Sequence, residues 1–290
     1  MTGEPTYASR SNKFYDTISA KLGVGVDGLM PNCWSRPHVK GGLITMGADG
    51  DSYYEYLLKG WLQTGRTDRR LWDMYNAAVD GMLKRMVVRN PEDGLTYLAI
   101  FHWPGGHQEH VMEHLACFVP GWLILGAQYQ PDPARQVAHV KLAEELAYTC
   151  WQMYEQQPTG IGPERVKRMK MDLSVTDTRE YILRPEALEG WWYMWELTGD
   201  PKYREWGWKA FTSFEKHLKV QHGYASLKDV RDAGRGHIDK MESFWVAETL
   251  KYAYLLQDPS HPIRVDKFVM NTEAHPLPVG NVPWLQRGPA

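Results

Sequence analysis

Apolar residues recur with the period of an α-helix along most of the chain, so the sequence predicts a mainly helical protein. Gly and Pro separate the periodic segments. Gly199 suits a helix C-terminal cap, and Pro201 suits the first position of the next helix. Strand-like runs occur at 94–101, 222–227 and 267–279, whereas 158–182 is polar and predicts a long loop. The predicted helices cover residues 10–22, 51–64, 68–88, 110–128, 133–156, 183–198, 201–218 and 241–256.

A repeated spacing links two of the predicted helical hairpins. A glutamate is followed six residues later by a tryptophan, then by a Thr-Gly pair and a second tryptophan. The copies begin at Glu55 and Glu189, and Glu248 begins a partial third copy. Equal spacing indicates one helix–turn–helix unit used repeatedly. We therefore expect an all-α fold, an (α/α) toroid of helical hairpins with short β-hairpins, including one near the C-terminus.

Composition narrows the possible partners. The chain has 290 residues, 43% of them hydrophobic, and a net charge of −2 without a long basic run. Nucleic acid and anionic membrane surfaces are therefore not expected partners. No apolar stretch reaches the ~18 residues of a membrane span, and the N-terminus lacks the apolar centre of a signal peptide. The thirteen Trp and sixteen Tyr side chains by themselves favour core packing, although aromatic faces also stack on sugars.

Carboxylates gather near the starts of three predicted helices. Acids are favoured at helix N-termini, so each of them alone is best explained by helix capping or by the helix dipole. As a group on inner helix faces they would be costly unless paired, hydrated or linked to a metal. Carboxylates that converge over aromatic walls suit the cleavage of a sugar acetal. These residues are Asp51, Glu55, Glu186, Glu189, Glu242 and Glu248.

Histidines and cysteines give weaker signals. His107, His110 and His114 have helical spacing, but no acids are arranged around them, so a zinc site is not expected. None of the cysteines lies in a C-x-x-C pair, and by themselves they predict buried thiols. The three cysteines are Cys33, Cys117 and Cys150.

Five segments together resemble the family 47 glycoside hydrolases, the calcium-dependent α-1,2-mannosidases, in the family's order. The resemblance extends over about residues 27–279. It implies an (α/α)7 barrel in which a terminal β-hairpin plugs one end and carries a calcium-binding threonine. The five segments are GDSYYEYLLKGW, MEHLACFVPG, LRPEALEGWWYMW, MESFWVAETLKYAYLL and NTEAHPLP.

The resemblance also implies roles for individual residues. Glu186 matches the family's general base, and Asp51 matches a second catalytic carboxylate. Arg184 and His114 match residues that orient the sugar and the acids. Phe244 matches the aromatic residue that packs under the bound mannose. The reaction is expected to invert the configuration of the sugar.

The implied cofactor is Ca²⁺. Thr272 matches its direct ligand, whereas Glu189, Glu248 and Glu273 match carboxylates that hold the metal's water molecules. Glu248 also matches part of the floor under the substrate. A hard cation with few protein ligands and many waters is chemically reasonable.

The resemblance further implies a Cys117–Cys150 disulfide, which would form in an oxidising compartment. Cys33 has no counterpart. By the same resemblance we expect high-mannose N-glycans as the substrate and the secretory pathway, in the lumen of the endoplasmic reticulum or Golgi, or secretion, as the location.

The resemblance is incomplete at the N-terminal side. Asp51 lies close to the start of this chain, and no block in residues 1–50 matches the one that supplies the family's general acid. We therefore expect residues 1–290 to form a single, partial barrel domain that the missing half or another chain completes. Three readings remain: a calcium-dependent α-1,2-mannosidase, a glycan-binding or structural pseudoenzyme, and a helical interaction scaffold.

Overall fold

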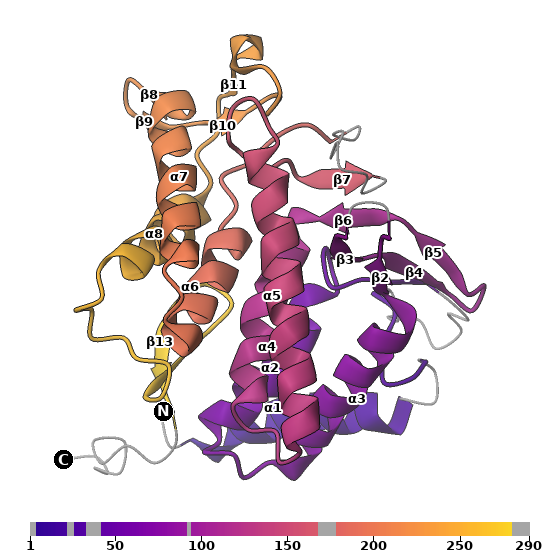
Figure 1. The fold of residues 1–290 in the computed structure, drawn as a ribbon. Coiled ribbons are helices and arrows are strands. Elements are labelled where there is room, and N and C mark those ends of the chain that lie inside the picture. The colour runs from indigo at the N-terminus through magenta and orange to yellow at the C-terminus, as the bar shows by residue number, and fades with distance from the viewer. Residues whose placement is uncertain (1–3, 22–25, 33–41, 92–93, 168–177, 280–290) are drawn as a thin grey trace, which may run out of the picture.

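Helices dominate the structure, a computed structural model that describes residues 4–21, 26–32, 42–91, 94–167 and 178–279 (Figure 1). The positions of the predicted helices are confirmed in most cases to within a few residues. The α-helices are α1 (Pro5–Lys21), α2 (Asp51–Gln63), α3 (Arg69–Arg85), α4 (Val119–Ala127), α5 (Pro133–Glu155), α6 (Glu186–Thr198), α7 (Lys202–His217) and α8 (Leu250–Gln257).

The helices pack as successive hairpins. Helix α2 packs on α3, α4 on α5, and α6 on α7. The first helices of these hairpins also contact one another, because α4 touches both α2 and α6, and α6 touches α8. Two rows of helices result, which agrees with the repeated hairpin unit expected from the sequence. In Figure 1, α6, α7 and α8 lie to the left of α5, and the strands β4 and β5 lie to its right.

Helix α4 is the centre of the core because its sequence, VPGWLILGA, is apolar on every side and all its residues are buried. Two of its glycines permit close approach of neighbouring helices. A Cβ atom at Gly126 would overlap the Tyr75 hydroxyl of α3. A Cβ atom at Gly121 would lie 2.7 Å from the Tyr193 ring of α6. Larger residues here would push the helices apart.

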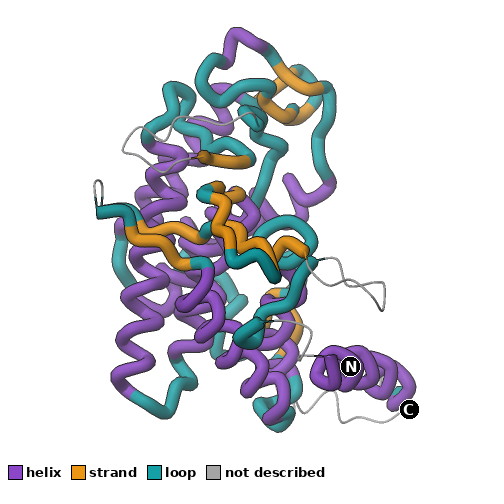
Figure 2. Tube along the Cα trace, turned by 90° about the vertical axis from the view of Figure 1, so that its right-hand side faces the viewer, coloured by secondary structure: helices purple, strands orange, loops and turns teal. Residues whose placement is uncertain are grey.

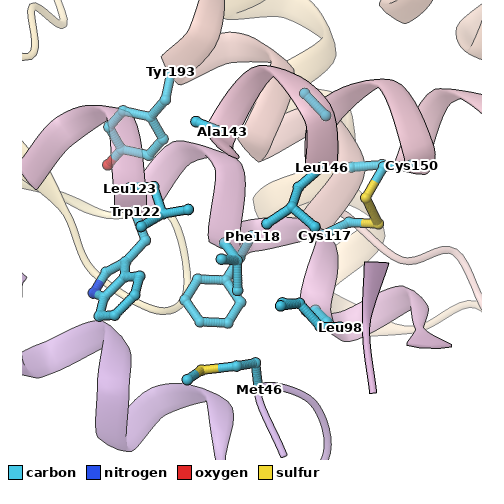
Figure 3. Close-up of a cluster of buried hydrophobic side chains, with 14 of the residues drawn as sticks. Met46, Leu98, Cys117, Phe118, Trp122, Leu123, Ala143, Leu146, Cys150 and Tyr193 are labelled. Atoms are coloured by element: carbon cyan, nitrogen blue, oxygen red, sulfur yellow. A yellow bond between two sulfur atoms is a disulfide. The ribbon is translucent and has the colours of Figure 1, made fainter. Parts of the chain in front are cut away.

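A disulfide joins the helical layers beside this core (Figure 3). Cys117, in the 3₁₀ turn η2 (His114–Phe118), is bonded to Cys150 of α5. Phe118 and Leu146 pack next to the bridge in the same apolar cluster. The predicted pairing is therefore present, while Cys33 lies outside the described residues.

Short antiparallel strand pairs accompany the helices, and Figure 2 shows several of them in front of the helical layers. Strands within 94–101, 222–227 and 267–279 were expected and are found, the last of these as the C-terminal hairpin. The pairs are β1 (Gly42–Ile44) with β4 (Ile100–Trp103), β4 with β5 (His107–Glu109), β2 (Val87–Arg89) with β3 (Thr96–Leu98), β6 (Val111–Glu113) with β7 (Arg165–Lys167), β8 (Lys219–Val220) with β9 (Gly223–Tyr224), β10 (Ser226–Leu227) with β11 (His237–Ile238), and β12 (Phe268–Met270) with β13 (Pro276–Pro278).

The expected helix over 110–128 is wrong in its first half. Residues 111–113 form β6, which pairs with β7 from the segment expected to be a loop, and η2 follows before α4 begins. Backbone pairing with a distant strand overrides the local helical period here. His107 lies on β5 and His114 in η2, so the helical spacing of the three histidines does not exist in the fold.

Candidate active site

A small pocket lies where the first turns of α2 and α6 meet the π-helical turn η4 (Trp245–Thr249) and the C-terminal hairpin. Its volume is about 50 Å³. Five residues assigned to the site from the sequence come together here, although they are spread over more than 200 positions of the chain. The lining residues are Asp51, Ser52, Glu55, Leu115, Phe118, Pro185, Glu186, Glu189, Glu248 and Thr272.

Helix starts position the acids. Asp51 is the first residue of α2, Glu186 is the first residue of α6, and Glu189 lies in the first turn of α6. The partial positive charge at a helix N-terminus favours carboxylates in these positions. Of the six acids expected near helix starts, all except Glu242 line the pocket.

Glu186 is held as an ionised carboxylate. The Nδ1 atom of buried His114 lies 2.8 Å from its Oε2 atom, and the His114 Nε2 atom lies 2.7 Å from the Tyr154 hydroxyl. The Arg184 guanidinium is 3.9 Å from the Glu186 Oε1 atom. Burial raises the pKa of Glu186, but the hydrogen bond with His114 and the nearby Arg184 guanidinium outweigh it, so the pKa lies below its usual value.

Arg184 and Phe244 were expected at the site, but neither is among the residues that line the pocket. The Arg184 Nε atom donates a 2.9 Å hydrogen bond to Glu164 Oε2. Its guanidinium lies 5.8 Å from the centroid of the half-buried Phe244 ring, within range of a cation–π contact. Sequence reasoning missed Glu164 because it lies in the polar segment expected to be a loop.

Asp51 has the opposite environment to Glu186. Burial and the charges of Glu186 and Glu55 raise its pKa, whereas the Ser52 amide lowers it by donating a 2.7 Å hydrogen bond, and the resulting pKa is about 6. Asp51 therefore takes up a proton in mildly acidic solution, where Glu186 remains ionised.

A buried lysine lies under the pocket. The Lys59 Nζ atom is 2.6 Å from Glu55 Oε1 and 3.1 Å from Glu189 Oε1, and the lysine side chain is 3% exposed. Burial nevertheless raises the pKa of Glu189 to about 7. The sequence contained one signal for this ion pair, because Glu55 and Lys59 are four residues apart on a helix.

Glu248 adds a further acid to the lining of the pocket. Burial, together with the charges of Glu189, Glu186 and Glu273, raises its pKa to about 8. Glu273 itself is exposed and does not line the pocket. The neighbouring Thr272 has its hydroxyl 3.5 Å from that of Ser52, and its amide donates to the Tyr56 hydroxyl at 3.2 Å, so the hairpin is joined to α2.

Comparison with known families now adds to this geometry. The profile described as Glycosyl hydrolase family 47 matches residues 1–279. The chain belongs to glycosyl hydrolase family 47. The family membership inferred from the five sequence segments is confirmed.

Relatives within family 47 share the same region. Mannosyl-oligosaccharide 1,2-alpha-mannosidase IA of Sus scrofa is 39% identical over 288 residues, which cover 96% of this chain and 42% of that protein. Endoplasmic reticulum mannosyl-oligosaccharide 1,2-alpha-mannosidase of Homo sapiens is 38% identical over 294 residues, covering 96% of this chain and 41% of that protein. The chain thus spans less than half the length of these relatives.

A solved structure supports the family 47 fold. The alpha-1,2-mannosidase from Trichoderma reesei superposes with a TM-score of 0.82 at 27% sequence identity, covering 96% of this chain and 62% of that one. Helical packing with short strand pairs is therefore shared with that mannosidase. None of the helices in the described part of the chain is long and apolar enough to cross a membrane.

Within the described residues, the family 47 pocket offers a cation few direct protein ligands. Among the residues described, no group of three or more His, Cys, Asp or Glu side chains is arranged to hold a metal ion. The pocket does combine the Thr272 hydroxyl with the acids Glu189 and Glu248. The raised pKa values of Glu189 and Glu248 mean that their ionised forms are disfavoured, and a bound cation would stabilise those forms. The donor set is all oxygen, as Ca²⁺ prefers.

Proposed function

We propose that this chain carries the base side of an active site that hydrolyses α-1,2-linked mannose in high-mannose N-glycans. One observation carries the proposal: Glu186 is held ionised by His114 at the edge of a pocket that contains four further acids. The printed names of the relatives, mannosyl-oligosaccharide 1,2-alpha-mannosidases, support the substrate class.

Glu186 would act as the general base. A carboxylate that stays ionised can accept a proton from the attacking water. Inverting glycosidases use such a base about 6.5–9.5 Å from the acid. His114 keeps the Glu186 carboxylate in one orientation by holding its Oε2 atom. Asp51, with a pKa of about 6, would act as a second catalytic carboxylate and as a weak proton donor. Arg184 and Phe244 would orient the sugar and pack under it.

The site would use Ca²⁺ as its cofactor. Thr272 would supply a direct oxygen ligand, and Glu189, Glu248 and Glu273 would hold the water molecules around the ion. When bound, a hard cation of this kind takes oxygen ligands and binds sugar hydroxyl groups. The raised pKa values of Glu189 and Glu248 support this assignment, because a cation would stabilise their ionised forms.

We further infer that the helical rows form part of an (α/α)7 barrel. The TM-score of 0.82 against a solved alpha-1,2-mannosidase and the repeated hairpin packing support this inference. The Cys117–Cys150 bridge is consistent with the lumen of the secretory pathway, because disulfides persist in oxidising compartments.

Proton NMR of the sugar released from an α-1,2-linked mannobiose tests the function. β-Mannose should appear first, and Glu186→Gln should abolish its release. Glu155→Gln, which changes a half-exposed acid at the end of α5, is the matched control and should leave the rate unchanged. α-Mannose as the first product would contradict inversion, and equal turnover by wild type and Glu186→Gln would contradict the base.

The second candidate is a glycan-binding pseudoenzyme. Such a protein would keep the Glu186–His114 pair and the Thr272 hydroxyl as binding groups without turning substrate over. Calorimetry with mannobiose distinguishes the two, because binding without turnover in the full protein would favour the pseudoenzyme. A protein that binds neither glycan nor calcium would instead be the helical interaction scaffold.

A further inference from the structure

A buried carboxylate outside the pocket is joined to the turn that leads into it. Glu113, at the end of β6, is 5% exposed. Its Oε2 atom accepts hydrogen bonds of 3.1 Å from the Thr45 hydroxyl and from the Ala48 amide. Its Oε1 atom accepts from the Arg165 Nε and Nη2 atoms at 3.1 and 2.6 Å. Both carboxylate oxygens are therefore fully used, which is expected of a buried charge.

The turn that Glu113 holds ends at Asp51. The Gly47 amide donates to the Thr45 hydroxyl at 2.8 Å, and the Gly47 carbonyl accepts from the amides of Gly50 and Asp51 at 3.0 and 2.9 Å. A Cβ atom at residue 47 would overlap the Glu113 carboxylate. An unbroken set of hydrogen bonds thus runs from the Glu113 side chain to the backbone of Asp51.

His114, the residue that follows Glu113, holds the second acid of the pocket, Glu186. Glu113 has extended backbone angles, and consecutive residues of extended backbone point to opposite sides. Glu113 contacts the turn before Asp51, whereas His114 contacts Glu186 at 2.8 Å. Strand β7 fixes this junction from the other side, because Arg165 is the register partner of Glu113 and the Glu164 carbonyl accepts from the His114 amide at 2.9 Å.

We propose that Glu113 is a positioning residue that fixes Asp51 relative to Glu186 by holding the turn of residues 45–50. The proposal rests on the mannosidase function proposed above. A junction that holds both acids through adjacent residues sets their separation without touching substrate. Misplacement of a reacting group by about 1 Å can lower the rate by about 10².

Glu113→Gln tests the proposal in the full protein. The amide nitrogen of glutamine cannot accept a hydrogen bond, so one side of the clamp is lost at nearly constant volume. We expect kcat on α-1,2-linked mannobiose to fall about 10- to 100-fold with KM nearly unchanged. Hydrogen exchange at the amides of residues 48–51 should become faster, while exchange in α5 should not change.

Glu145→Gln is the matched control. Glu145, on α5, also accepts from a threonine hydroxyl, that of Thr96 at 3.0 Å, and from an arginine, Arg89 at 3.2 Å, but does not line the pocket. Its substitution should lower the melting temperature without lowering kcat. If Glu113→Gln does not fold, Thr45→Val is tested in its place. It removes one donor to Glu113 without removing the charge, and it should lower kcat by a smaller factor.

The outcomes separate this proposal from the proposed function. Normal kcat in a folded Glu113→Gln protein, or a loss no greater than in Glu145→Gln, would overturn the positioning role. Unchanged exchange at residues 48–51 would overturn it as well. Equal turnover by wild type and Glu186→Gln would overturn the proposed function itself, whatever the exchange at the turn.

Discussion

At the scale of single residues, two carboxylates of the pocket have environments that shift their pKa values in opposite directions. His114 and Arg184 lower the pKa of Glu186 against the effect of burial, whereas burial with neighbouring acids raises that of Asp51 to about 6. Pairs of titratable groups with pKa values moved apart are typical of acid–base sites. The cation proposed for this pocket would lie beside Glu248, whose pKa burial and neighbouring acids raise to about 8.

Thr272→Ala tests the proposed calcium ligand. Removing the hydroxyl should remove calcium binding and the rise in melting temperature that calcium produces, because a ligand stabilises the state that binds it. Isothermal titration calorimetry with Ca²⁺ measures the affinity. Thr178→Ala, which changes a threonine that does not line the pocket, should keep wild-type affinity. Unchanged affinity in Thr272→Ala would rule out this ligand.

The raised pKa values predict how stability depends on pH. Glu248 has a folded pKa of about 8 and Glu189 of about 7, both above the ordinary value of 4.5. Between the unfolded pKa of 4.5 and these folded pKa values, the folded state binds more protons than the unfolded state. The free energy of unfolding therefore falls as pH rises through this range. In a chelator, the melting temperature should therefore decrease from pH 5.5 to pH 8.

Glu248→Gln should flatten this dependence, because the glutamine side chain does not titrate. Added calcium should also reduce it, since a cation stabilises the ionised acids. Thermal denaturation followed by circular dichroism gives the comparison. A melting temperature that rises over the same pH range in chelator would contradict the pKa assignments.

At the scale of elements, the disulfide between η2 and α5 supports the junction that carries His114. Cys117 and Cys150 are 33 positions apart, and a bridge closing a loop of this length contributes about 3–4 kcal/mol in the chain-entropy account. Cys117→Ala with Cys150→Ala should lower the free energy of unfolding by roughly this amount. Urea denaturation measures the change.

Peptide mapping without reduction checks the pairing itself. We expect a Cys117–Cys150 linked peptide with Cys33 as a free thiol in protein made in an oxidising compartment. A bridge to Cys33, or no loss of stability in the double variant, would contradict the assignment.

At the scale of the whole molecule, the relatives are more than twice as long as this chain, which covers 42% of the Sus scrofa enzyme. Residues 1–290 tested by themselves should bind mannose-type ligands weakly and hydrolyse them slowly. The residues proposed for the base and the cation are present, but acid–base assistance typically contributes about 10²–10⁴ in rate. Asp51, with a pKa of about 6, is mostly ionised at neutral pH, so it would substitute poorly for the acid there.

Supplying the upstream hairpins of a family 47 relative, fused or as a second chain, should raise the rate of release of mannose. The rate with Glu186→Gln in the completed protein should return to background. Full activity of residues 1–290 alone would show that the general acid lies within these residues.

The local sequence was sufficient to predict most of the helices and the family. The 3.6-residue period, the Thr-Gly pairs and the acids at helix starts are properties of neighbouring residues, so they predicted α2, α5, α6 and α7 closely. The five segments added the family and the Cys117–Cys150 pair, both of which are confirmed. Of the acids expected from them, Asp51, Glu186, Glu189 and Glu248 line one pocket, whereas Glu273 does not.

Only the tertiary structure showed which residues hold the acids of the pocket in place. Val111–Glu113 becomes a strand because Arg165–Lys167, more than 50 positions away, supplies its hydrogen-bond partners. The same long-range contacts place Lys59 against Glu189 and join Glu113 to the turn before Asp51. A periodic pattern reports which face of a segment is buried, whereas the partner of a buried charge depends on which distant segment the fold brings against it.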